Sequence, residues 1–362
     1  MLKRKDLMAN AHVSWFGQGG EDGDIVLFSA VNLARNYRDL PFPIQADEDE
    51  MQVAFDRTKD FIDEAGKAMG TKFSFWDADE LQEWERSGLA EKRLAGHAFC
   101  ESDCPSASMI AEEQDLAIFI NEEDHLNFIA LQTGLAPRDV YQRASDLEDV
   151  IEAKEDFAFS ERMGYLTSEP SRTGTGLRAS VALHLPGLVL SGNIGHVTRA
   201  TQKLGLSMEG LFGDNASEAG HMYVVENQAT LGFSEAEILK NLEAAANEII
   251  EQERRARNAL SLYDKTRLED DCYRTLGILR YARSLTEDEV HKYLSKLRLG
   301  VDMELVPEID PLFFAEAVLG TRERLVAARA EKDRLRNDPP MNRERAEYVR
   351  CLLCEGGRFC FS

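Results

Sequence analysis

GTGLRASV, at residues 174–181, joins a glycine-rich turn to an apolar segment that continues to Leu190. Glycine adopts backbone conformations that other residues avoid, so such a loop lets the chain approach a ligand closely. In the apolar segment, large side chains alternate in a way that is typical of a strand. We therefore expect a strand over residues 181–190 that is entered from a ligand-facing loop.

Two further strands are expected on the N-terminal side of this loop. Residues 24–34 (DIVLFSAVNLA) are β-branched and apolar and follow a turn-rich stretch, which predicts a buried strand. Residues 116–120 (LAIFI) form a second short apolar run. The charged NEEDH at residues 121–125 ends it abruptly, and such a cluster at a strand end is expected to face a cleft or solvent.

Helical periodicity marks the rest of the chain. The expected helices cover residues 47–68, 234–262, 284–299, 310–336 and 342–353, with proline 339 and proline 340 between the last two. Ser234, followed by Glu235 and Glu237, is a plausible N-cap. The pattern predicts an α+β domain at residues 1–262 and a helical domain at residues 263–362.

The charge pattern excludes several partners. The chain has 362 residues and a formal net charge of -23, which argues against tight binding to nucleic acid or to anionic membranes. It has no apolar run of about eighteen residues, and its basic N-terminus lacks a following apolar region. We expect a soluble cytoplasmic protein.

The cysteines and histidines give little indication of a metal site. Cys351, Cys354 and Cys360 have a spacing that could chelate a metal, but a fourth ligand is missing. Reduced thiols on the last helix and in the tail are the alternative, and we favour it. His125 and His184 are expected to make local hydrogen bonds, because no second ligand lies at a recognisable spacing.

Three stretches carry a resemblance to a known family: residues 121–126 (NEEDHL), residues 174–181, and residues 227–232 (NQATLG). Supporting matches occur at residues 33–36, 41–43, 164–168, 184–186 and 298–300. Their order and spacing resemble the ATP:guanido phosphotransferases, and within them the bacterial protein arginine kinases. The resemblance implies an antiparallel, glutamine-synthetase-like sheet flanked by helices, followed by a helical C-terminal domain.

The resemblance also implies where ATP would be held. Phosphoryl transfer to a guanidinium requires neutralisation of the polyphosphate, and the family uses five arginines because guanidinium groups grip phosphate oxygens in pairs. This sequence has Ala30, Asn32, Asn127 and Glu209 at four of the five positions. Arg178 is the fifth, and it either binds an anion or pairs with Glu169 or Glu209.

The remaining site residues follow from the same resemblance. Ala179 and Ser180 belong to the matched loop, and Arg93 resembles a position beside the adenine. Glu169 stands where the family has a cysteine. On the acceptor side, Glu123 matches the glutamate that orients the guanidinium and Asp214 replaces a second glutamate, whereas Glu122 and Asp124 match carboxylates near magnesium-bound waters.

The binding energy lost with the four missing arginines favours impaired ATP binding. A hydrogen bond to a charged group contributes roughly 1.5–3 kcal/mol, so four missing arginines remove on the order of 6 kcal/mol. That corresponds to about four decades in affinity. Glu209 would in addition repel a phosphate by up to about 4 kcal/mol at a separation of about 4 Å.

Three functional hypotheses follow. The first is a pseudokinase that acts by binding protein or guanidinium groups, since its cleft residues Glu123, Glu169, Glu209 and Asp214 suit a cation. The second is an active kinase that uses Mg-ATP, with Arg35, Arg93 or Arg172 in place of the missing arginines; convergence of three or more arginines on Arg178 would favour it. The third is an oligomeric scaffold, which an exposed apolar patch on residues 275–335 would support.

The partners are also implied by the resemblance. They are a protein that carries arginine, a small zinc-binding activator and a second copy of the chain, in a bacterial stress-response setting. Residues 341–346 (MNRERA) resemble the phosphoarginine pocket of the bacterial enzymes, where Arg345 and Ala346 match but Met341 and Asn342 do not. An ordinary amphipathic helix is the favoured interpretation there.

Overall fold

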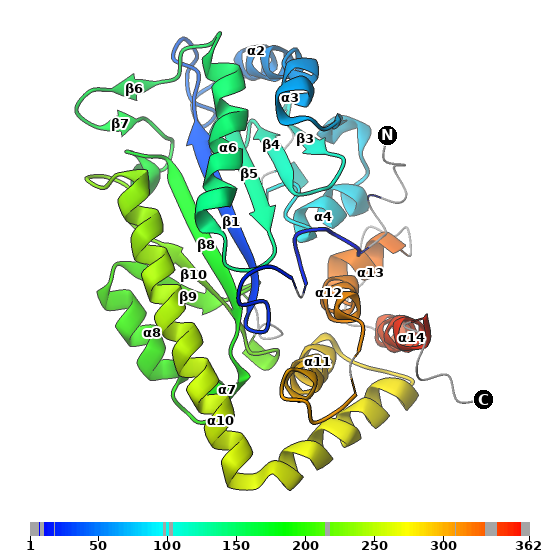
Figure 1. The fold of residues 1–362 in the computed structure, drawn as a ribbon. Helices are drawn as coiled ribbons and strands as arrows, with labels where there is room; N and C mark the ends of the chain where they lie inside the picture. Colours follow the sequence, from blue (N-terminus) through cyan, green and yellow to red (C-terminus); the bar gives the residue numbers. More distant parts are fainter. Residues whose placement is uncertain are drawn as a thin grey trace.

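The computed structural model describes residues 7, 11–17, 19–96, 99–100, 104–213, 218–307, 309–329 and 339–355. Its centre is an eight-stranded sheet in which every pair of neighbours is antiparallel, with the order β2-β3-β4-β5-β1-β8-β10-β9 (Figure 1). This confirms the α+β class and the antiparallel sheet flanked by helices.

The strands of the sheet are short. Their bounds are β1 Val26–Arg35, β2 Phe73–Asp77, β3 Ala107–Ala111, β4 Leu116–Ile120, β5 Leu126–Gln132, β8 Leu177–His184, β9 Leu206–Gly210 and β10 Met222–Asn227. A separate small hairpin pairs β6 (Phe159–Ser160) with β7 (Gly164–Tyr165). The strands expected at residues 24–34 and 116–120 are β1 and β4.

Helices cover both faces of the sheet. Their bounds are α2 Glu48–Lys59, α3 Ile62–Met69, α4 Glu83–Glu91, α6 Pro137–Glu152, α7 Pro186–Leu190, α8 Ile194–Lys203, α10 Glu235–Tyr281, α11 Glu287–Asp302, α12 Pro311–Gly320, α13 Glu323–Arg329 and α14 Pro339–Glu355. Short 3-10 turns occur at Ala78–Glu80 and Pro170–Arg172.

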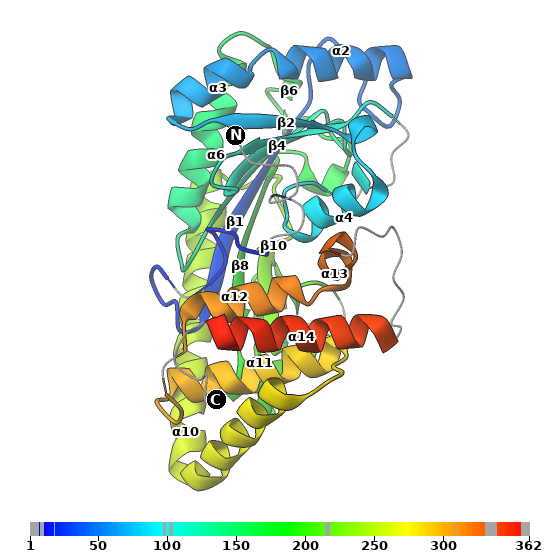
Figure 2. The same cartoon turned by 90° about the vertical axis from the view of Figure 1, so that its right-hand side faces the viewer.

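The two faces bury separate hydrophobic cores. Phe28 and Ala30 of β1 pack with α4 and with α11 to α14, whereas Val31 and Leu33 of the same strand pack with α6 and α10. This split follows from the alternation of side chains along a strand. Figure 2 shows α4 and α13 close together on the first of these faces.

Three element predictions are corrected. The strand expected at residues 181–190 ends at His184, because Pro186 begins helix α7. The helix expected at residues 47–68 is two helices, separated at residues 60–61. The helix expected at residues 310–336 is interrupted at Thr321, and residues 330–338 lie outside the described ranges.

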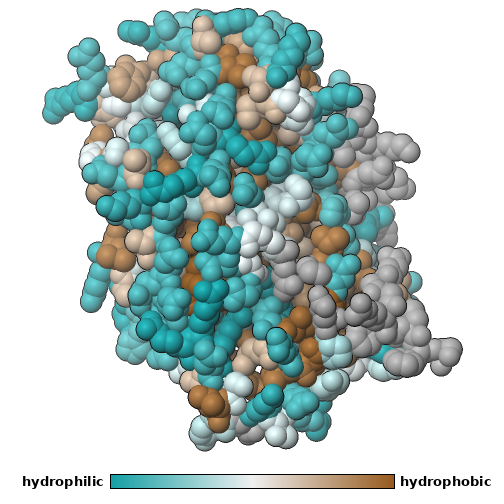
Figure 3. All heavy atoms as spheres, in the orientation of Figure 1, coloured by the Kyte–Doolittle hydropathy of each residue, from teal (hydrophilic) through white to brown (hydrophobic). Residues whose placement is uncertain are grey.

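Helix α10 is longer than expected. The capping box of Ser234 and Glu237 begins it as predicted, but it runs to Tyr281 and so passes through the expected domain boundary at residue 262. In the part of the chain that the structure describes, no helix is long and apolar enough to cross a membrane. The face seen in Figure 3 is mainly hydrophilic, with hydrophobic side chains in small groups.

Candidate functional site

Strand register brings several predicted site residues to one face of the sheet. Asn32 of β1 lies opposite Arg178 of β8, and Ala30 lies opposite Ser180. Ser180 is in turn opposite Glu226 of β10. Together they line one wall of a cleft of about 480 Å³, which is a size typical of small-molecule sites.

The other walls of the cleft come from α4, from the loop after β9 and from the α12–α13 region. They include four side chains that the sequence alone did not indicate: Glu91, Phe212, Arg322 and Arg324. Arg93 joins them from the turn after α4, where its backbone has a positive φ of 56°. Its guanidinium donates a 3.0 Å hydrogen bond to the carbonyl of Leu211 and lies 5.1 Å from the ring centroid of Phe28.

Arg178 is held between two carboxylates. Its Nε lies 3.2 Å from Oε1 of Glu226, and its Nη2 lies 3.8 Å from Oε2 of Glu169. The ion pair with Glu169 was one of the sequence alternatives, whereas Glu226 was not anticipated. Burial raises the pKa of Glu226, and the nearby Arg178 lowers it.

Arg172 occupies the space beside two of the substituted positions. Its guanidinium donates to Oδ1 of Asn127 at 3.1 Å and to Oδ1 of Asn32 at 2.6 Å, and the residue is only 4% exposed. Burial lowers its pKa, and the positive charge of Arg178 acts in the same direction. A buried guanidinium whose hydrogen bonds are made within the protein in this way stabilises the fold and does not serve as a ligand contact.

Arg35 has a different structural role. It forms a two-point ion pair with Glu148 of α6, with one contact of 3.1 Å, and stacks on Tyr165 with 3.5 Å between guanidinium carbon and ring centroid. Arg35 therefore lies on the α6 side, away from the cleft.

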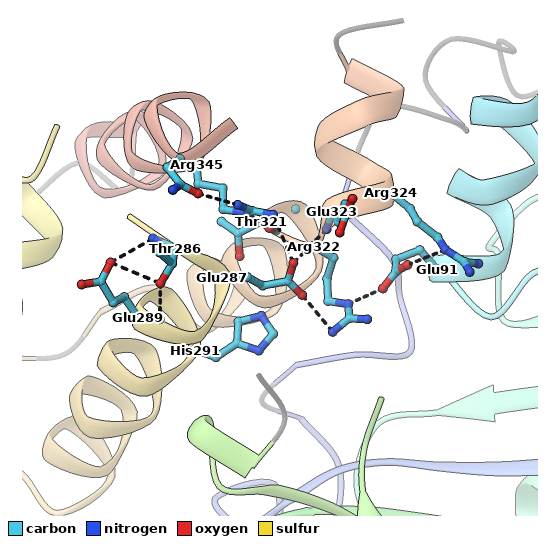
Figure 4. Close-up of polar contacts among 12 residues, drawn as sticks. Glu91, Thr286, Glu287, Glu289, His291, Thr321, Arg322, Glu323, Arg324 and Arg345 are labelled. Carbon is cyan, nitrogen blue, oxygen red and sulfur yellow. Dashed lines mark hydrogen bonds and ion pairs between the residues drawn. The ribbon is translucent and has the colours of Figure 1, made fainter. Parts of the chain in front are cut away.

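Ion pairs connect the cleft to the C-terminal helices (Figure 4). Arg322 pairs with Glu91 of α4 and, at 3.0 Å, with Glu287 at the start of α11, and it stacks 4.0 Å from the ring centroid of Phe212. Glu287 also accepts from Arg345 of α14 at 3.2 Å. Arg324 lies 3.7 Å from Glu91.

The carboxylates after β4 have three different environments. Glu122 accepts a 2.6 Å hydrogen bond from the backbone N–H of Gly96, and burial raises its pKa to about 7. Glu123 is exposed. Asp124 is fully buried, and its Oδ1 accepts from Asn36 and from the backbone of Ser168, at 2.6 and 2.7 Å.

The other predicted residues are spread more widely. Glu169 accepts from the hydroxyl of Ser171 at 2.6 Å, and Glu209 is exposed on β9. The side chain of Ala179 belongs to the core on the opposite face of the sheet, and its N–H donates to Asn227. Asp214 and Cys360 lie outside the described residues.

The histidines and the last helix have structural partners. His125 accepts from the N–H of Tyr37 at 3.2 Å, and His184 lies 2.8 Å from the hydroxyl of Ser295, which confirms local hydrogen bonding for both. Arg345 is fully buried and donates to the carbonyl of Thr321 at 2.7 Å and to Asn342 at 2.9 Å. Among the residues that the structure describes, no cluster of three His, Cys, Asp or Glu could hold a metal ion.

Comparison with known proteins agrees with this architecture. Residues 55–256 match the ATP:guanido phosphotransferase C-terminal catalytic domain, and residues 265–357 match the protein-arginine kinase McsB C-terminal domain. The curated protein-arginine kinase of Halothermothrix orenii is 37% identical over 88% of this chain and 90% of its own length. That of Bacillus subtilis is 35% identical, over 89% and 88%.

Solved structures agree on the fold. Lombricine kinase superposes with a TM-score of 0.55 at 21% identity, over 68% of this chain and 71% of its own. A duplicated taurocyamine kinase from Schistosoma mansoni superposes with a TM-score of 0.56 at 20% identity, over 74% of this chain and 40% of its own.

Proposed function

Because the chain belongs to the protein-arginine kinase family of ATP:guanido phosphotransferases, we propose that it is a pseudokinase of that family, which acts by binding protein or guanidinium groups. The observation that carries the proposal is the contact of Arg172 with Asn32 and Asn127. At these two positions the family resemblance implies phosphate-binding arginines. Here they accept hydrogen bonds from a buried internal guanidinium instead.

The other two substitutions support the same conclusion. Ala30 lines the cleft with a methyl group, and Glu209 places an exposed carboxylate on β9. Arg178, the arginine that is kept, is balanced by Glu226 and Glu169. An incoming triphosphate would therefore compete with the carboxylates of Glu226 and Glu169 for Arg178.

The test is phosphoarginine formation from Mg-ATP and an arginine-containing protein. We expect a rate no higher than that of Glu123→Gln, the variant that lacks the proposed guanidinium-orienting carboxylate. Mg²⁺ would enter here with ATP as part of the substrate. Transfer at an ordinary enzyme rate that Glu123→Gln abolishes would refute the proposal.

A second candidate function is phosphotransfer with atypical nucleotide contacts. The observation that favours it is that Arg93, Arg322 and Arg324 line the same cleft as Arg178. The same assay separates the two functions.

The proposed partners follow from the family. We propose a cytoplasmic, arginine-bearing protein as the main partner, with a small zinc-binding activator and a second copy of the chain as further candidates. Exposed apolar residues on α10, with Leu262 and Tyr263 about nine-tenths exposed and Tyr281 also exposed, support self-association. Figure 3 shows hydrophobic atoms at the bottom of the molecule, where α10 bends in Figure 1. A monomeric mass at micromolar concentration would contradict the dimer.

A further inference from the structure

We propose that strand β2, which forms one edge of the eight-stranded sheet, pairs with β2 of a second copy of this chain, so that the two sheets continue across a two-fold axis. This surface is separate from the apolar residues of α10 described above. Figure 2 shows β2 near the top of the molecule and the bend of α10 at the bottom. The proposal does not depend on whether the chain transfers phosphate.

The hydrogen bonds of β2 to β3 involve its even-numbered residues. Just before the strand, the N–H of Glu112 donates to the carbonyl of Lys72 at 2.9 Å. Just after it, the N–H of Ala78 donates to the carbonyl of Ser106 at 3.0 Å. The register between these two contacts is continuous, and successive residues of an antiparallel strand point their N–H and C=O groups to opposite sides. The odd-numbered residues therefore direct these groups away from β3.

The outward residues are Phe73, Phe75 and Asp77. Among the described residues, no backbone hydrogen bond outside the ladder involves their N–H or C=O groups. Edge strands are usually protected by proline, by a bulge or by charged side chains, but residues 73–77 read FSFWD and pair with β3 without a bulge. Lys59 lies 5.0 Å from the ring centroid of Phe75, and since side chains stand perpendicular to a sheet, it covers a face of β2 and not its edge.

A two-fold pairing centred on Phe75 uses all three outward residues. Phe75 then lies opposite Phe75 of the second copy, and Phe73 lies opposite Asp77. Each such pair can exchange two hydrogen bonds, which gives up to about six across the axis. Aromatic residues that meet across neighbouring strands add to the stability of a sheet.

The charges at the two ends of β2 favour a second copy over a foreign strand. Lys72 precedes the strand, whereas Asp77, Asp79 and Glu80 follow one another at its other end. In an antiparallel pair, the basic end of one copy lies beside the acidic end of the other. A foreign strand needs a matching charge pattern of its own, but β2 supplies both halves of this one.

A cavity at the basic end leaves room for the second copy. It has a volume of about 580 Å³ and lies between α3 and the start of β2, where Lys67 and Lys72 line it together with Asp63 and Glu112. The acidic turn that follows β2 of the second copy would enter here and contact the two lysines. Because the lining has two groups of each charge, it does not select a small anion, which agrees with a protein occupant.

The first experiment measures self-association of the full chain by sedimentation equilibrium at about 150 mM salt, because the net charge of -23 repels a second copy at lower salt. The main variant is Lys72→Glu. The rescue variant combines Lys72→Glu with Asp79→Lys, which restores opposite charges across the axis. The matched control is Lys203→Glu, the same change on an exposed lysine at the end of α8.

We expect the wild type to associate and Lys72→Glu to weaken the association about tenfold, since the two-fold axis repeats the lost contact. The rescue variant should return to within about threefold of the wild type, and Lys203→Glu should stay within about twofold. Thermal melting checks that each variant is folded. Equal effects of Lys72→Glu and Lys203→Glu, or no association up to about 100 μM, would overturn the proposal.

The second experiment locates the contact by residue-resolved hydrogen exchange at several protein concentrations. The N–H groups of Phe73, Phe75 and Asp77 should exchange more slowly as the concentration rises, whereas those of Ser74 and Trp76 are protected throughout by β3. Protection of the outward groups that does not change with concentration would show that the edge is closed within one chain. Loss of association in Tyr263→Ser but not in Lys72→Glu would place the contact on α10 instead. Either result would overturn the proposal.

Discussion

At the scale of single residues, the buried Arg172 explains how this chain tolerates polar substitutions inside its cleft. Arg172 is 4% exposed, and its two hydrogen bonds go to amide oxygens of Asn32 and Asn127 rather than to carboxylates. Buried polar groups are stable only when they are hydrogen-bonded. The three residues therefore form one unit, in which loss of the arginine leaves two amide oxygens without a donor.

This unit predicts a stability cost. Arg172→Ala should lower the free energy of unfolding by about 2–4 kcal/mol, because it leaves unsatisfied oxygens and a cavity. Urea denaturation at neutral pH measures the change. Arg162→Ala, an exposed arginine of the nearby β6–β7 turn, is the control and should change stability little. Equal effects of the two variants would show that Arg172 is not part of the core.

Glu122 predicts a pH dependence. Burial raises its pKa from the ordinary value of 4.5 to about 7, so the folded chain keeps a proton that the unfolded chain releases. The contribution of this group is therefore most favourable at low pH, and stability is lost as pH rises from about 4.5 to about 7. Over this pH range, this group lowers the free energy of unfolding by up to roughly 3 kcal/mol.

The variant Glu122→Gln should remove this part of the pH dependence while its side-chain oxygen still accepts from Gly96. Denaturant unfolding at a series of pH values from about 4.5 to about 8 measures the slope. The exposed neighbour gives the control variant Glu123→Gln, which should keep the wild-type slope. An unchanged slope in Glu122→Gln would show that this carboxylate does not retain its proton in the folded chain.

At the scale of elements, the start of α11 combines a helix cap with a charge contact. The hydroxyl of Thr286 accepts from the N–H of Glu289 at 3.2 Å, and the carboxylate of Glu289 accepts from the N–H of Thr286 at 2.9 Å. Glu287 lies in the same first turn and contacts Arg322 and Arg345 (Figure 4). The cap thus fixes the carboxylate that joins the α12–α13 connection to α14.

Removing this cap should have a local effect as well as a general one. Thr286→Ala should cost about 1 kcal/mol of stability and speed hydrogen exchange in the first turn of α11. Thr286→Ser retains a side-chain oxygen and should behave nearly as the wild type. If exchange increased equally in the alanine and serine variants, the cap would not be the cause.

The elements also show what sequence pattern can and cannot predict. Strand β4 and the start of α10 were predicted to the residue or within one, because an abrupt polarity change and a capping box are local signals. At the break, Gly320 is not followed by a proline that would mark the end of a helix. The buried side chains on both sides of Thr321 belong to one hydrophobic core. The apolar periodicity alone therefore predicted one helix where the structure has α12 and α13.

At the scale of the whole molecule, the cleft combines residues that are distant in the sequence. The substituted positions Ala30 and Asn32 were identified from short motifs, since the family pattern fixes their spacing. Arg322 and Arg324 could not be identified in this way. They follow Glu91 by more than two hundred residues in the sequence, and they lie beside it only because the C-terminal helices pack there. Tertiary packing, not local pattern, decides the charge of this cleft.

The contact between Glu91 and Arg322 predicts an energetic link between the sheet domain and the C-terminal helices. Both side chains are largely buried, at 7% and 12% exposure. Removal of one partner leaves a largely buried charge with one counter-ion fewer, since Arg322 keeps Glu287 and Glu91 keeps Arg324, so Glu91→Ala and Arg322→Ala should each destabilise by up to about 3 kcal/mol. The double variant should cost less than the sum, with a coupling energy of about 1–3 kcal/mol.

Denaturant unfolding of the four proteins in this cycle measures the coupling, and hydrogen exchange shows whether α4 and α13 loosen together. The control is the same double-mutant cycle on Arg274 and Asp270. These residues form an exposed ion pair on α10 with a short N–O distance of 2.6 Å. Exposed pairs are screened by solvent, so this control should show little coupling despite its good geometry. Equal coupling in the two cycles would mean that burial at the cleft adds nothing, and that the C-terminal helices are held on the sheet by apolar contacts alone.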